Sequence, residues 1–201
     1  MPAKNVIKSY DIPAFYHVYN RGAGKQIIFN DDIDREKFLS LFARYLDPDD
    51  ESVRADGLPY AKYDLDVVAY CLMDNHFHLL LYQEIDLNAV SEFMKSISTA
   101  YTMYYNKRHG AAGHLFQGIF KASKITNDEY LLHITRYIHM NPRSYLRYKW
   151  SSIASYLGGG VPAWLSPDRV PAMRPDEYRQ FLQEYEGKRA ELKLLQDQLV
   201  G

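Results

Sequence analysis

The sequence lacks most features of secreted and membrane-spanning proteins. Cys71 is the only cysteine among 201 residues, so the chain cannot form an internal disulfide. The longest apolar runs, such as residues 79–82, are a few residues long, whereas a membrane helix needs about 20. Residues 1–4 show neither the apolar core nor the cleavage site of a secretory signal. These absences predict a globular protein without a membrane span, resident in the reducing cytoplasm.

A strong net charge and a glycine-rich nucleotide-binding loop are also missing. With 24 Lys and Arg against 25 Asp and Glu, the net charge is −1, which at first disfavours a nucleic-acid partner. The charge is unevenly distributed, however, because nine Lys or Arg and only two acids lie in residues 95–149, a local net charge of +7. This basic segment predicts either a phosphate-binding surface or an ordinary solvated one.

The pattern of apolar residues predicts an α+β fold. Aromatic and β-branched runs predict strands at residues 14–20, 65–73, 76–82 and 115–125. Apolar residues at helical spacing predict helices at residues 31–46, 87–108 and from about 127 to just before Pro142. This βαββαβ order is that of a ferredoxin-like sandwich with an antiparallel sheet, whose first and third strands are central neighbours, plus one added helix.

Composition changes near Trp150. Residues 1–150 are predicted to form one domain, and residues 151–201 a linker and a helical C-terminal extension. Three consecutive glycines at 158–160 and several prolines indicate the linker. A final helix is expected from about Asp176, with a stripe of leucines at positions 192, 195 and 199.

Two separated groups of polar residues are candidates for chemistry. Alternation along a strand places His76 and His78 on one face and Phe77 on the other, so the two imidazoles can hold one divalent metal ion. Packed or surface histidines are nevertheless the commoner case. Tyr137 and Asn141 are four residues apart and share a helix face, although most of the 18 tyrosines must serve packing. His133 lies one turn earlier on the same stripe.

Together these motifs resemble the REP-associated tyrosine transposases, a branch of the single-tyrosine HUH transposases of bacterial insertion sequences. The resemblance spans roughly residues 10–160 and is carried by YHVYNRG (16–22), MDNHFHLL (73–80), YIHMNP (137–142) and WSS (150–152). It implies that His76, His78 and Asn141 hold Mg²⁺ or Mn²⁺ and that Tyr137 is the nucleophile. Many relatives have proline where this chain has Asp74, which adds a carboxylate near the metal.

The resemblance implies a DNA transposase and endonuclease that cleaves and rejoins single-stranded, hairpin-flanking DNA through a 5′-phosphotyrosine intermediate. Its partners would be single-stranded and hairpin DNA, and it would act as a monomer or homodimer. The candidates for phosphate contacts are Arg21, Lys121, Lys124, Arg136 and Arg143. Tyr101, Tyr104 and Tyr105 are candidates for base stacking, with packing the more usual role. His17, expected beside the His76 strand, is a candidate to support the metal site, with a packing or surface role the more usual.

Other functions remain open on the sequence. A domesticated, non-cutting protein could use the same fold to bind hairpins or single strands, although binding alone does not require His76, His78, Tyr137 and Asn141 together. A histidine-triad nucleotide hydrolase needs a third alternating histidine, but position 80 is Leu80. A zinc hydrolase needs further His, Asp or Glu ligands at close spacing, and none stands out.

Overall fold

A computed structural model describes residues 10–188 of the chain. Its centre is an open, four-stranded antiparallel sheet in the order β2-β3-β1-β4. The strands are β1 (Ala14–Arg21), β2 (Asp66–Met73), β3 (His76–Gln83) and β4 (Lys121–Ile125). The predicted α+β sandwich is therefore confirmed, with the first and third strands as central neighbours.

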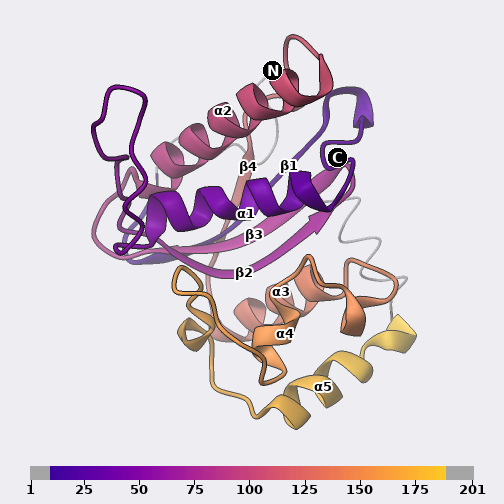
Figure 1. The fold of residues 1–201 in the computed structure, drawn as a ribbon. Helices are drawn as coiled ribbons and strands as arrows, with labels where there is room; N and C mark the ends of the chain where they lie inside the picture. The colour runs from indigo at the N-terminus through magenta and orange to yellow at the C-terminus, as the bar shows by residue number, and fades with distance from the viewer. Residues whose placement is uncertain (1–9, 189–201) are drawn as a thin grey trace, which may run out of the picture.

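Helices cover both faces of this sheet (Figure 1). One face carries α1 (Asp32–Leu46) and α2 (Ala89–His109), and the other carries α3 (Asp128–His139), α4 (Ile153–Tyr156) and α5 (Pro175–Gln183). Short 3-10 helices are η1 (Ala23–Lys25), η2 (Tyr145–Arg147), η3 (Pro167–Arg169) and η4 (Glu186–Lys188). Within residues 10–188, no helix has the length and apolar character that crossing a membrane requires.

Side-chain alternation divides the molecule into two cores. Val18 of β1 and Phe77 of β3 pack with α1 and α2. Leu80 of β3 packs with α3, α4 and α5 on the opposite face. Because His76 and His78 alternate with Phe77, they lie on the face that α3 covers, as the strand pattern predicts.

The fourth strand begins later than predicted. Residues 115–125 were expected to form one strand, but β4 starts only at Lys121. The reason is a side-chain bond, since Asn20 Nδ2 donates to the carbonyl of Gly118 at 3.1 Å where strand pairing would otherwise continue. Before this point, the chain pairs with the end of β1 through an isolated bridge between Gly22 and Phe116.

The C-terminal extension packs on the sheet as far as the structure describes it. Ile153, Tyr178 and Leu182 join the core beneath α3, and Ser151 forms a bridge with Cys71 of β2. The predicted final helix corresponds to α5, which begins at Pro175. The leucine stripe at positions 192, 195 and 199 lies outside the described residues.

Candidate active site

The side chains implied by the resemblance meet between β3 and α3. His76 Nε2 lies 3.3 Å from Asn141 Oδ1, and the Tyr137 ring packs edge-on against His78 with centroids 5.2 Å apart. The rings of His76 and His78 are also edge-to-face, at 5.1 Å. Asn141 lies two residues beyond the end of α3, so it reaches His76 from the turn that follows the helix rather than from the helix itself.

Both histidines are held through Nδ1 by a neighbouring side chain. His76 Nδ1 lies 2.7 Å from Asn75 Oδ1, and His78 Nδ1 lies 3.0 Å from His17 Nε2. An amide oxygen can only accept, so His76 donates from Nδ1 and keeps a lone pair on Nε2. That lone pair then faces the oxygen of Asn141, which also only accepts. Two acceptors this close to each other favour a proton or a cation between them.

Burial keeps these imidazoles uncharged near neutral pH. It lowers the pKa of His78 well below its ordinary value and lowers that of His17 to about 3. Burial also lowers the pKa of His76, and the Asn141 oxygen, which accepts a hydrogen bond only from the charged ring, opposes this effect. Neutral rings retain the lone pairs that a metal ligand needs.

These residues fit a divalent metal ion. His78 Nε2 is buried and has no hydrogen-bond partner among the described residues, which suits a nitrogen reserved for a ligand. His76 Nε2 and Asn141 Oδ1 supply a second nitrogen and an oxygen beside it. Residues 10–188 contain no metal-binding group of three His, Cys, Asp or Glu side chains, so the donor set depends on the amide of Asn141.

A buried hydrogen-bond chain docks the end of α3 onto the sheet. His139 Nδ1 lies 2.6 Å from the hydroxyl of Tyr178 in α5, and its Nε2 lies 2.7 Å from Ser152 Oγ. The same Ser152 oxygen accepts from the backbone N–H of Tyr70 in β2 at 2.9 Å. His139 and Ser152 belong to the YIHMNP and WSS motifs, but sequence reasoning gave them no role. Their contacts fix the helix that carries Tyr137.

Two of the candidate phosphate contacts lie on the active-site face. Arg21 is opposite His76 in the β1–β3 register, and Lys121 is opposite Tyr19 in the β1–β4 register. Arg21 hydrogen-bonds Gln117, and the Lys121 ammonium lies 5.7 Å from the Tyr19 ring centroid. Arg143 is exposed, two residues after Asn141. Arg21 and Lys121 therefore lie beside the strand residues of the site, and Arg143 is close to Asn141 along the chain.

The other two candidates are placed differently. Arg136 is buried, with its guanidinium 3.8 Å from the ring centroid of Tyr185 and 4.2 Å from that of Phe181. The predicted phosphate role of Arg136 is therefore corrected to one of packing against α5. Lys124 forms a 2.8 Å ion pair with Asp11 and is opposite Tyr16, which points into the α1–α2 core.

Several other expected neighbours of the site are engaged elsewhere. The extra carboxylate of Asp74 pairs with Arg35 of α1 rather than with the histidines. His133 is nearly half exposed and approaches Glu129 on α3. The tyrosine candidates for stacking lie on α2, across the sheet from Tyr137, where Tyr101 is buried and donates to the carbonyl of Ile28.

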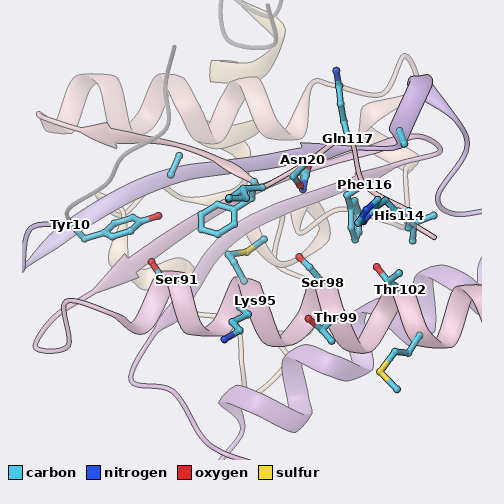
Figure 2. A pocket seen from close by; sticks show the side chains of 18 residues that line it. Tyr10, Asn20, Ser91, Lys95, Ser98, Thr99, Thr102, His114, Phe116 and Gln117 are labelled. Carbon is cyan, nitrogen blue, oxygen red and sulfur yellow. The ribbon is translucent and has the colours of Figure 1, made fainter. Parts of the chain in front are cut away.

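A cavity of about 1070 Å³ lies on the face of the sheet opposite Tyr137. Figure 2 shows Ser91, Ser98 and Thr102 of α2 facing it from one side and Asn20 and Phe116 from the other. Because the sheet separates this cavity from His76, His78 and Tyr137, it is not part of the candidate active site.

Comparison with known proteins agrees with the motifs and the fold. Residues 60–141 match the family model described as "Transposase IS200 like", a segment that includes both histidines, Tyr137 and Asn141. The structure of a REP-associated tyrosine transposase bound to a REP hairpin aligns with a TM-score of 0.55 and 13% identity, over 85% of this chain and 95% of that chain. No curated protein matches significantly.

A second solved structure, of a Deinococcus radiodurans R1 protein assigned as a transposase, aligns with a TM-score of 0.41 and 13% identity, over 69% of this chain and 95% of that chain. This likeness is too low to support an argument. The family match confirms the predicted resemblance to the IS200-like transposases over residues 60–141, and the first structural likeness confirms the fold.

The docking of α3 predicts the effect of one substitution. Ser152→Ala removes the buried hydroxyl that both His139 and Tyr70 contact, so it should lower the free energy of unfolding by about 1–3 kcal/mol. Chemical denaturation measures this change. Ser144→Ala, at an exposed position, is the matched control and should stay within about 0.5 kcal/mol of the parent. Equal effects of the two substitutions would contradict this role of Ser152.

Proposed function

We propose that this protein is a DNA transposase and endonuclease that cuts and rejoins single-stranded DNA beside a hairpin. Tyr137 is the nucleophile, and His76, His78 and Asn141 hold Mg²⁺ or Mn²⁺. The observation that carries the proposal is the convergence of Tyr137, two histidine nitrogens and the Asn141 oxygen on one sheet face. All four lie within the segment that matches the IS200-like transposases.

The reaction requires attack on a phosphodiester, whose negative charge repels nucleophiles. A bound divalent cation supplies neutralisation of that charge at a non-bridging oxygen. The Tyr137 hydroxyl oxygen attacks phosphorus, so that a new oxygen–phosphorus bond forms while the bond from phosphorus to the 3′ oxygen breaks. Tyr137 loses its phenolic proton to solvent, and the departing 3′ oxygen takes up a proton.

The products are a 5′-phosphotyrosine and a free 3′-hydroxyl. Because the phosphotyrosine linkage conserves the energy of the broken bond, a 3′-hydroxyl from another strand can reverse the step and join two strands. No nucleotide hydrolysis is therefore needed. This matches a sequence without a glycine-rich nucleotide-binding loop.

The surroundings of Tyr137 favour a flexible substrate. Tyr137 is only 4% exposed. A phosphate can therefore reach it only if the residues packed around α3 move aside and the DNA strand bends toward the tyrosine. A single strand can bend in this way, whereas a rigid duplex resists it. Arg21 and Lys121 are proposed phosphate contacts because they lie on the same face, and Arg143 is proposed because it is exposed and follows Asn141 by two residues. The hairpin partner is proposed from the similar structure, which is bound to a REP hairpin.

The first prediction of the proposed function concerns the covalent intermediate. Incubated with Mn²⁺ and a pool of 3′-labelled hairpins with randomised single-stranded flanks, the parent should form a labelled protein adduct that survives denaturing electrophoresis. Tyr137→Phe removes the nucleophilic oxygen and should form none while still binding the pool. Tyr130→Phe, on the same helix, is the control and should form the adduct normally. Tight binding without any adduct by the parent would instead favour the non-cutting alternative.

A second prediction addresses the metal ligands. His76→Ala and His78→Ala should each reduce adduct formation by at least about 100-fold, because each removes a donor for the ion that offsets phosphate charge. Asn141→Ala should have a smaller effect, since it removes one ligand of three and leaves both histidine nitrogens in place. His133→Ala, at the partly exposed histidine of α3, should cut like the parent. Undiminished cutting by both histidine variants in chelator would refute the metal site.

The third prediction concerns salt. Removing two phosphate contacts should reduce the slope of log K against log salt by about 1.4 for single strands. We therefore expect Lys121→Ala with Arg143→Ala to flatten the slope by this amount in binding titrations. Arg179→Ala with Lys188→Ala, at exposed positions of α5 and η4, is the charge-matched control and should leave the slope unchanged. Identical slopes for the two double variants would argue against this DNA path.

A further inference from the structure

His17 has a direct contact with one of the proposed metal ligands. It lies on β1 opposite Leu80, so His78 is its diagonal neighbour on the same face of the sheet. The two rings are nearly parallel, at 17°, and His17 Nε2 lies 3.0 Å from His78 Nδ1. Both side chains are fully buried, so water does not compete for this bond.

A hydrogen bond between two ring nitrogens needs an N–H on one ring and a lone pair on the other. If His78 donates from Nδ1, its Nε2 keeps a lone pair and can bind a metal ion. If His17 donates instead, the hydrogen of His78 resides on Nε2, and that nitrogen cannot be a ligand. The direction of this one hydrogen bond therefore decides whether His78 Nε2 can bind a metal ion.

The number of unsatisfied nitrogens is the same for both directions of the hydrogen bond. His17 Nδ1 and His78 Nε2 both lack a hydrogen-bond partner among the described residues. Either direction thus leaves one N–H and one lone pair unsatisfied on the two rings. A bound cation favours one of the two arrangements, because it can bind only the one in which His78 Nε2 carries no hydrogen.

We infer that His17 is a positioning residue, which accepts the Nδ1 hydrogen of His78 and so presents the His78 Nε2 lone pair to the metal ion. The inference rests on the proposed function. Metal-bound histidines generally donate their second ring N–H to a neighbouring acceptor. Asn75 is the acceptor beside His76 Nδ1, and His17 is the acceptor proposed for His78 Nδ1.

The identity of this acceptor suits a site that handles DNA. A carboxylate at position 17 would accept the same hydrogen more strongly, but it would place a negative charge in a buried site that must admit a phosphodiester. An imidazole accepts the hydrogen without adding charge. His17 also packs edge-on against Tyr137, with ring centroids 5.6 Å apart, so its orientation bears on both the ligand and the nucleophile.

Substitutions of His17 can separate the effect of its acceptor atom on metal binding from the effect of the size of its ring. In His17→Gln, the amide oxygen is as many bonds from Cβ as Nε2 is, so it can accept the His78 hydrogen. In His17→Asn, the oxygen corresponds to Nδ1 and falls short of His78. His17→Phe keeps an aromatic ring but has no acceptor. We expect the parent and His17→Gln to bind the metal ion with similar affinity. His17→Asn and His17→Phe should both bind it more weakly.

The test measures Mn²⁺ binding by electron paramagnetic resonance, with no DNA present. His17→Phe and His17→Asn should bind Mn²⁺ about 10–100-fold more weakly than the parent, and His17→Gln should remain close to it. Nitrogen-15 spectra of the Mg²⁺-bound parent should show the shared hydrogen on His78 Nδ1, coupled across the bond to His17 Nε2. Thermal unfolding of each variant confirms that it is folded.

The outcomes distinguish this inference from the proposed function. If the parent binds Mn²⁺ and His78→Ala abolishes binding, but His17→Phe binds as tightly as the parent, only the role of His17 is overturned. A hydrogen on His17 Nε2 in the Mg²⁺-bound protein overturns it as well. If the parent binds no ion, or if His76→Ala and His78→Ala do not alter binding, the metal site itself fails and the inference fails with it.

Discussion

The pairing of β1 with β3 is the constraint on which the rest of the site depends. Side chains alternate along these strands, so one register places His17, His76 and His78 beneath α3 and sends Phe77 into the opposite core. A slip of one residue would exchange the two sets, burying imidazoles among the phenylalanines of α1. The apolar core on the α1–α2 face therefore stabilises the register that the chemistry requires.

The second requirement is a fixed position for α3. Tyr137 lies near His78 only because the end of its helix is docked, through His139 and Ser152, onto β2 and α5. Arg136 strengthens this contact by stacking on aromatic rings of the C-terminal extension. The extension thus contributes to the support of the active-site helix, although none of its side chains is among the proposed ligands or nucleophile.

The features predicted correctly are those encoded by local patterns. Alternation predicted the face of His76 and His78, and the aromatic and β-branched runs predicted the strands that form β2 and β3. The start of β4 was missed, because a side chain of β1, Asn20, takes the place of a backbone partner there. Such a contact between residues 98 positions apart leaves no periodic signal.

The same limit applies to charged residues. Arg136 and Lys124 look alike in the sequence, as cations within the basic segment. Their roles are set by Phe181, Tyr185 and Asp11, which lie far away along the chain. Three-dimensional partners, rather than local charge density, therefore decide which cations are paired within the protein. Two further cations of the segment are paired at the start of α1, Arg108 with Asp31 and Lys149 with Asp32.

Under the proposed function, one tyrosine among 18 becomes joined to DNA. The most direct measurement is mass spectrometry of the trapped adduct after digestion with protease and nuclease, which identifies the peptide that carries a nucleotide. We expect a single modified peptide, from α3, with the nucleotide on Tyr137 through a 5′ phosphate. A nucleotide on any other residue, or a 3′-phosphate linkage, would contradict it.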